Sequence, residues 1–254
     1  MKVGQTNSVS DHSEQYFNLI DAALSYSADQ IKKNAIDDFV KSAKRKGYWD
    51  KIIGLYLPIW GNITANKYNL KNPLLKELSF SGSITHANGS IAGSGGAYID
   101  SGINPSIDGL TNDSALLSFN CLTDSSEDVV DMGAYGSITQ QMYIKAKDSS
   151  GNSESSIYLN TNKVSASTSS SSGFFTSNRN SSTSLSLHKD NLLIASTSSS
   201  GGTIINGNVY LLAANSGGSP SDASSRNYNF FCVGKGITLI SDFNSDISSL
   251  LSNI

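Results

Sequence analysis

Short alternations of apolar and polar residues, separated by Ser, Gly, Asn and Thr, fill the chain from about residue 62 onward. In one of them Leu117, Phe119 and Cys121 fall on the same face of an extended segment, as a half-buried strand requires. A series of short strands with turn residues between them predicts a mainly β fold, an antiparallel β-sandwich or jelly roll. The candidate strands are residues 78–84, 97–100, 115–122, 128–132, 138–146, 156–160, 163–168, 185–189, 192–197, 208–214 and 228–234.

Apolar residues recur at helical spacing between residues 28 and 46, with lysines and aspartates between them. This spacing predicts an amphipathic helix that packs one face on the rest of the protein. Ser27 is placed to cap the start of this helix, and Gly47 is placed to end it in a left-handed conformation. Shorter helical segments are expected at residues 13–24 and 48–53.

The end of the chain returns to helical spacing. Thr238 can cap a segment whose apolar residues form one stripe, which should dock on the body of the protein: Ile240, Phe243, Ile247, Leu250 and Leu251. The predicted organisation is an N-terminal helical module over residues 1–60, a β-sandwich over residues 61–237 and a C-terminal helix over residues 238–254. The serine-rich run 167–172 is expected to be a loop within the sandwich.

Composition limits the classes of protein that remain. Charged residues make up 15% of the 254 residues, against roughly 25% in an average soluble protein, so a mostly helical surface is not expected. Residues 1–78 hold 11 Lys and Arg against 8 Asp and Glu, a net charge of +3, and the remainder holds 7 against 13, a net charge of −6. The total of −3 shows no electrostatic footprint for nucleic acid. The basic cluster at residues 41–46 is explained by its place at a helix C-terminus.

No segment predicts contact with a membrane. Residues 1–10 lack the apolar core of a signal peptide, and no stretch approaches the roughly 20 apolar residues of a membrane span. We therefore expect a soluble product made in a cytoplasm, with no membrane insertion. Cys121 and Cys232 each lie inside an apolar run, so they are expected to be buried free thiols.

The order of elements near residues 184–214 resembles that of a known fold. Residues 184–195 predict two strands around a tight turn at Asp190 and Asn191, and residues 207–214 predict a strand that leads into a Gly-rich loop. This order resembles the laminin-G or concanavalin-A-like lectin jelly roll.

Longer segments resemble a lectin-like family found in structural proteins of tailed bacteriophages. They are residues 67–73 (KYNLKNP), 80–89 (FSGSITHANG), 97–100 (AYID), 104–105 (NP), 225–230 (SRNYNF), 234–238 (GKGIT) and the helical region 31–53. The resemblance covers nearly the whole chain and departs from the family at Leu239 and Ile240, where acidic residues are usual. It implies a virion protein of the tail, a fibre or the head surface, with a face that can bind glycans.

Catalytic constellations are weak in this sequence. Retaining glycoside hydrolases on similar folds need two carboxylates about 5 Å apart, and the densest acidic group, Glu127, Asp128 and Asp131, lacks a second Glu on the same face. A Gly-x-Ser-x-Gly elbow is absent. His188 is expected to face outward beside the hairpin turn. We therefore predict a protein without catalytic residues, and a glycoside hydrolase is the less favoured alternative.

Metal and cofactor motifs are also weak. The sequence has no Cys-x-x-Cys, no His-x-x-x-His and no EF-hand loop, and its Gly-rich runs do not open a helix as a phosphate-binding loop does. A lectin-type calcium site remains an alternative, because its ligands could come from the loop residues Asn215, Asp222 and Asp131. Asn and Asp in loops also serve as ordinary turn formers. No cofactor and no metal site are predicted.

The function predicted from sequence is a non-enzymatic virion protein with a lectin-like domain that binds host glycans. Sugar recognition would combine aromatic faces with Asn and Asp hydrogen bonds, and several copies in a symmetric array would raise the affinity. Other virion subunits are the expected partners. The alternative is a purely architectural head-decoration or tail-assembly protein. The candidate ligand-binding residues are His86, Tyr135, Asn215 and Asp222, with Tyr98 as a further exposed aromatic residue.

Overall fold

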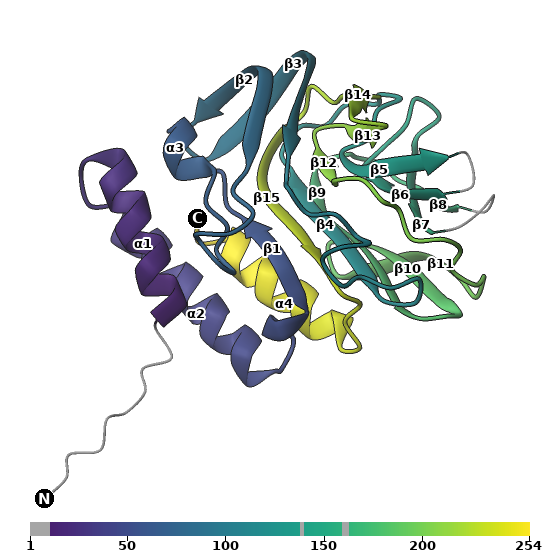
Figure 1. The fold of residues 1–254 in the computed structure, drawn as a ribbon, viewed down its shortest axis with the longest axis horizontal. Helices are drawn as coiled ribbons and strands as arrows, with labels where there is room; N and C mark the ends of the chain where they lie inside the picture. Colours follow the sequence, from purple (N-terminus) through teal and green to yellow (C-terminus); the bar gives the residue numbers. More distant parts are fainter. Residues whose placement is uncertain (1–10, 138–139, 159–162) are drawn as a thin grey trace, which may run out of the picture.

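A computed structural model describes residues 11–137, 140–158 and 163–254 (Figure 1). Within these residues the helices are α1 (Asp11–Leu24), α2 (Gln30–Arg45), α3 (Ile63–Asn66) and α4 (Ile240–Leu251), with a 3-10 turn, η1, at Trp49–Lys51. The strands are β1 (Ile52–Tyr56), β2 (Ser79–Ala87), β3 (Ser90–Asp100), β4 (Ala115–Cys121), β5 (Met132–Ser137), β6 (Gln140–Lys145), β7 (Asn152–Ile157), β8 (Val164–Ser167), β9 (Gly173–Ser181), β10 (Ser184–Lys189), β11 (Leu192–Thr197), β12 (Tyr210–Leu211), β13 (Ala214–Ser216), β14 (Ser219–Ser221) and β15 (Asn227–Gly234).

The strands form one strongly bent sheet that packs against itself. Its main path runs β11-β10-β9-β4-β15-β3-β12-β5-β6-β7-β8, and β1, β2, β13 and β14 join from the side. The strands β4 and β9 lie against β5, β6 and β7, and β8 and β11 at the two ends of the path are in contact. Apart from the parallel pair of β13 and β5, the described pairs are antiparallel. The fold is therefore the mainly β antiparallel sandwich that the sequence predicts.

Two apolar cores share the central strands. Leu117, Phe119 and Cys121 of β4 point between the two halves of the sheet, while Leu116 of the same strand points toward the helices. All seven residues of β4 are buried, because α2 and α4 cover its second face. The helices form a third layer on one side of the sandwich (Figure 1). Cys121 and Cys232 are buried free thiols, as predicted.

The helices predicted at residues 13–24, at 28–46 and after Thr238 are confirmed in position, and Gly47 has the predicted left-handed conformation, with φ +78°. The segment predicted to be helical at residues 48–53 is helical only at Trp49–Lys51, because Ile52–Tyr56 is strand β1, which pairs with β15.

The two predicted N-terminal caps are wrong. The side chain of Asp29, not that of Ser27, accepts the backbone N–H of Ile31 at the start of α2. Asp29 lies directly before the first helical residue, which is where a capping carboxylate can reach the free N–H groups. At α4 the N-cap residue is Leu239, without a side-chain hydrogen bond, so the cap predicted at Thr238 is not formed.

Several strand predictions are shifted, and β9 was missed. The strand predicted at residues 128–132 begins only at Met132, because Asp131 turns inward to a buried ion pair and Asp128 accepts a hydrogen bond from Ser149. The strand predicted at residues 156–160 lies earlier, at Asn152–Ile157. Residues 159 and 160 of that predicted strand lie outside the described residues, as do residues 138 and 139 of the strand predicted at 138–146. The run 167–172 contains a loop whose Ser171 is buried and donates to the Thr123 carbonyl.

Candidate functional site

Four tyrosines lie on the face of the sheet that points away from the sandwich core. Ile99, Leu211 and Met132 point into that core, so the alternation along β3, β12 and β5 turns their neighbours outward. Tyr210 of β12 is in register with Gly133 of β5, which is in turn in register with Tyr143 of β6. We call the four residues the tyrosine face: Tyr98, Tyr135, Tyr143 and Tyr210.

The tyrosine face consists of two ring pairs. Tyr98 and Tyr210 stack with centroids 4.5 Å apart, and Tyr135 and Tyr143 meet edge to face at 5.8 Å. Gly133 lies between the pairs, where a Cβ atom would come within 2.6 Å of the Tyr143 Cβ and the Met142 carbonyl oxygen. Tyr143 and Tyr210 are buried, whereas Tyr98 and Tyr135 are half-buried and keep part of their rings open to solvent.

Polar groups surround the half-buried Tyr135. Its hydroxyl donates to Asp222 Oδ2 at 3.2 Å, across the hairpin of β13 and β14. Ser216 of β13 is in register with Tyr135, and a pocket of about 370 Å³ opens here. Its lining consists of Tyr135, Gly136, Ser137, Gln141, Ser216 and Gly217. This combination of a ring face, hydroxyls, a carboxylate and an amide is able to hold a hydroxyl-rich ligand.

Burial and nearby carboxylates keep the phenols of Tyr135 and Tyr143 protonated. Burial first, and the Asp222 carboxylate second, raise the pKa of Tyr135 above its ordinary value. Burial and the hydrogen bond to Glu154 do the same for the pKa of Tyr143. Glu154 is buried beside Tyr143 and is ion-paired with Lys163. Tyr135 and Tyr143 therefore act as neutral hydrogen-bond donors near neutral pH.

The sequence-predicted residues separate into two places. Tyr135 and Asp222 meet directly, and Asn215 lies beside them on β13. Asn215 is buried, and its amide is used within the hairpin: it donates to the Asn208 carbonyl at 2.8 Å and accepts from Gly218 N at 2.7 Å. Its role in this structure is to shape the loop that carries Ser216.

His86 lies on β2 and contacts a different set of residues. Its Nδ1 is 3.0 Å from the Asn66 side-chain nitrogen, and its ring meets Phe80 edge to face at 4.7 Å. Burial lowers the pKa of His86, so the ring is neutral near pH 7. The structure therefore does not join His86 to Tyr135.

His188 was expected to face outward, and the structure contradicts this. Both ring nitrogens are buried and lack a hydrogen-bond partner among the described residues, and burial lowers its pKa. The reason is that the second face of β10 lies under the helical layer, since its neighbour in register, Thr176, donates to Asn244 of α4.

The acidic group considered for hydrolysis does not form a pair of carboxylates in a cleft. Asp131 is fully buried and accepts from Arg226 Nη1 at 2.9 and 3.0 Å, from Ala146 N at 2.6 Å and from the Tyr228 hydroxyl. Glu127 accepts from Ser125 Oγ and lies 4.0 Å from Arg226 Nε. The arrangement ties loops together around a buried guanidinium.

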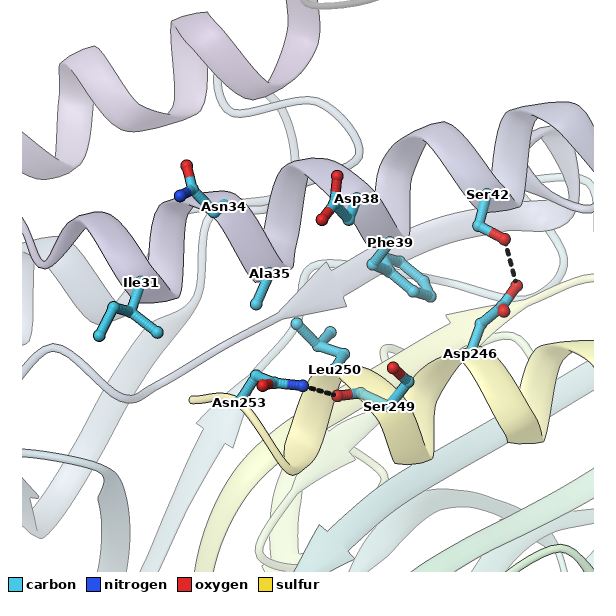
Figure 2. Close-up of a pocket in the computed structure, with 10 residues that line it drawn as sticks. All are labelled: Ile31, Asn34, Ala35, Asp38, Phe39, Ser42, Asp246, Ser249, Leu250 and Asn253. Atoms are coloured by element: carbon cyan, nitrogen blue, oxygen red, sulfur yellow. Dashed lines mark hydrogen bonds between the residues drawn. The ribbon is translucent and has the colours of Figure 1, made fainter.

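A second depression lies between α2 and α4 (Figure 2). Asp246 lies at one end of this groove of about 410 Å³ and accepts from Ser42 at 3.0 Å, Lys46 at 2.9 Å and Tyr48 at 2.6 Å. Burial pushes the pKa of Asp246 upward, but these hydrogen bonds outweigh it and leave the pKa below its ordinary value. Ile31 is 68% exposed at the open end (Figure 2).

The described residues contain neither a metal-binding cluster nor a helix that could cross a membrane. No group of three or more His, Cys, Asp or Glu side chains there is arranged to hold a metal ion. None of the helices in the described part of the chain combines the length and apolar character needed to cross a membrane.

Comparison with known proteins reveals similarity in structure but not in sequence. No protein-family model matches the chain, and no curated protein matches its sequence. Among solved structures, one that reports cell entry of botulinum neurotoxin type C through two ganglioside molecules has a TM-score of 0.54, with 13% identity over 80% of this chain and 52% of that chain. The chain has an antiparallel β-sandwich fold of the jelly-roll type.

Two further toxin structures agree with this fold. The binding domain of botulinum neurotoxin DC in complex with sialylT has a TM-score of 0.51 at 11% identity, covering 79% of this chain and 51% of that one. The serotype D binding domain has a TM-score of 0.50 at 13% identity, covering 80% and 52%. The chain thus spans about half the length of these toxin chains. The resemblance to phage structural proteins stays a prediction.

Proposed function

We propose that the chain is a non-enzymatic, glycan-binding protein of a virion surface, and that the tyrosine face with its adjoining pocket is the glycan site. The proposal rests on one observation: the half-buried Tyr135 donates a hydrogen bond to Asp222 beside the exposed residues Ser216 and Gly217, which line the same pocket as Tyr135. Sugars bind to such surfaces by stacking C–H faces on aromatic rings and by hydrogen bonding to carboxylate and amide groups. Support from the comparisons is limited to the fold, which is shared with toxin binding domains.

Single contacts of this kind are weak, so useful adhesion requires many copies. Linking several weak sites raises the overall affinity by a factor of roughly 10²–10⁴ without new contacts. A symmetric fibre or capsid array of this chain with other virion subunits would supply that multiplicity. Electron cryomicroscopy of an intact particle tests the virion assignment, which fails if the density holds no copy of this fold.

A glycan array with multimerised protein tests the binding site. Tyr135→Ala removes the exposed ring face and is expected to weaken each site about fivefold, which a multivalent array amplifies. Tyr135→Phe keeps the ring and removes only the hydroxyl that contacts Asp222, so it should retain most binding. Tyr26→Ala is the matched control, because Tyr26 is 64% exposed but follows α1 in the helical layer.

Two other outcomes would replace this proposal. If the correctly folded, multimerised protein binds no glycan on the array, the architectural alternative is favoured. In that alternative the groove between α2 and α4 contacts neighbouring subunits. Release of product from a polysaccharide, with loss of that activity in Glu127→Gln, would show a hydrolase.

A further inference from the structure

Tyr143 forms a three-part arrangement with two charged side chains. Its hydroxyl donates to the buried carboxylate of Glu154. Lys145 Nζ lies 5.5 Å from the centre of the Tyr143 ring and 3.9 Å from Glu154 Oε1. The other oxygen of Glu154 is ion-paired with Lys163, so the charge of this carboxylate is balanced within the chain. A ring, a carboxylate and an ammonium therefore lie together at Tyr143.

Tyr135, the other member of this ring pair, has only the first two parts. Its hydroxyl donates to Asp222 Oδ2 at 3.2 Å. Asp222 forms no ion pair with a Lys, Arg or His side chain of the described residues. None of the Lys or Arg side chains in the described part of the chain lies over the Tyr135 ring. The ring and the carboxylate are present here without an ammonium of the protein.

The Asp222 carboxylate is held at the hydroxyl end of the Tyr135 ring. The residue is exposed, yet its backbone carbonyl accepts from Val130 N at 2.7 Å and its Oδ2 accepts from Tyr135. Its Oδ1 accepts no hydrogen bond from the described residues. A carboxylate fixed in this way loses less conformational entropy when it meets a ligand than a free surface side chain does.

The open side of the Tyr135 ring favours a cation. The half-buried ring lines the pocket of about 370 Å³, and none of the described residues that line it is a Lys or an Arg. After burial, which is the largest cause, the charges that raise the pKa of Tyr135 are those of Asp222 and Glu154. The face of an aromatic ring also attracts cations, because its π-electrons carry a partial negative charge. Both effects act in the same direction.

We propose that this site selects amino sugars, whose ammonium group lies against the Tyr135 ring and donates to Asp222 Oδ1 while the sugar hydroxyls enter the pocket. The selection rests on the proposed function, because it assigns a sugar class to the same tyrosine face. An ammonium brings N–H donors and one positive charge, so Asp222 serves as acceptor and counterion together. A carboxylated sugar would bring a second negative charge beside Asp222 and is disfavoured.

Three methyl β-D-glycosides that differ in one group test the selection in the full chain. At pH 6 the glucosaminide carries an ammonium in place of one hydroxyl of the glucoside, and the glucuronide carries a carboxylate in place of its hydroxymethyl group. The backbone amides of Gly136 and Gly217, which line the pocket, report binding in ¹⁵N spectra. We expect the glucosaminide to bind about tenfold more tightly than the glucoside, because it adds an ion pair and a cation–π contact. The glucuronide should bind most weakly.

Asp222→Asn tests the residue to which the selection is assigned. Asn keeps an acceptor for the Tyr135 hydroxyl and tolerates the φ of +52° at this position, so the fold should be unchanged. The variant should bind the glucosaminide and the glucoside equally, with the glucoside affinity of the parent. Asp50→Asn is the matched control, because it removes the same charge from a side chain in the helical layer that is 96% exposed. The control should keep the preference for the glucosaminide.

Failure of the selection and failure of the glycan site give different results. Saturable shifts with the glucoside, without a preference for the glucosaminide, would overturn the selection and leave the glycan site standing. No shift of Gly136 or Gly217 with any of the three ligands would overturn both. A preference that persists in Asp222→Asn, or that is lost in Asp50→Asn as well, would also overturn the proposal, because the selection would then not come from Asp222.

Discussion

Replacing Asp131 by Asn is expected to destabilise the protein more than any surface substitution. Asn has nearly the same size as Asp but no charge, so the change removes the counterion of Arg226 and leaves the rest of the site filled. The Asp131 carboxylate is fully buried and accepts from three groups within 3.0 Å: Arg226 Nη1, Ala146 N and the Tyr228 hydroxyl. Arg226 also donates to the carbonyls of Ser125 and Lys147, so it cannot swing out to water without breaking those bonds.

The magnitude follows from this geometry. Removing one partner of a buried ion pair costs about 3–5 kcal/mol, because the other charge stays buried without compensation. The total stability of a domain is about 5–15 kcal/mol, so Asp131→Asn should remove a third or more of it. Urea unfolding followed by circular dichroism measures the difference. Asp50→Asn is the control, because the Asp50 side chain is 96% exposed beside Lys71 and should contribute less than about 1 kcal/mol.

A double variant tests whether the loss of stability in Asp131→Asn comes from the unpaired charge of Arg226. The double change Asp131→Leu with Arg226→Met removes both charges, and it should recover part of the stability lost in Asp131→Asn. A cost below about 1 kcal/mol for Asp131→Asn would refute the claim that this pair is closed to water.

Three further predictions concern other parts of the fold. Asp246→Asn should cost about 1–3 kcal/mol and lower the hydrogen-exchange protection of α4, because Ser42, Lys46 and Tyr48 all lose a charged acceptor. Burial lowers the pKa of His86 and His188, so the unfolded chain takes up protons first and the thermal midpoint should fall as the pH drops below about 6.5. Asn191→Val should cost about 1 kcal/mol in urea unfolding and Asn191→Gly nothing, because Asn191 has φ +71°.

Each of these has a contradicting result. Unchanged exchange in α4 would show that Asp246 does not hold the helix. A thermal midpoint that is flat between pH 7 and 5 would show that the two histidines take up protons in the folded protein. Equal stability of the Val and Gly variants would show that the hairpin turn relaxes away from its left-handed conformation.

Local patterns in the sequence were enough for elements whose partners are near in the chain. The apolar residues between positions 28 and 46 place α2 within two residues of its observed bounds, and the Asp190–Asn191 turn has positive φ at both residues, as predicted. The sequence analysis predicts no strand at β9, because the polar residues Thr176, Asn178 and Arg179 interrupt the apolar pattern there. Their hydrogen bonds go to Asn244, Ile237 and Ile157, which only the folded chain brings to them.

The same limit applies to the candidate site. Tyr135 and Asp222 were selected separately as an exposed aromatic residue and a loop carboxylate, and the structure places them 3.2 Å apart. Tyr143 and Tyr210 were not selected. Tyr143 and Tyr210 share a face because β12 and β6 are both in register with β5. This register connects segments up to 77 residues apart in the chain, as Tyr210 with Gly133. The alternation of residues within one strand does not predict which distant strand it will pair with.

The strand β2 has a consequence for how copies of this chain avoid one another. Within the part of the chain that the structure describes, β2 pairs with β3 alone, so its other side offers N–H and C=O groups that a strand of a second molecule could join. The register shift between Ser81 and Ser83, at Gly82 with φ +80°, divides this nine-residue border into two short pieces. A strand of a second molecule can therefore pair with only one of the two pieces before the register shift interrupts the hydrogen bonds. This interruption disfavours the growth of fibres from a protein with few charged residues.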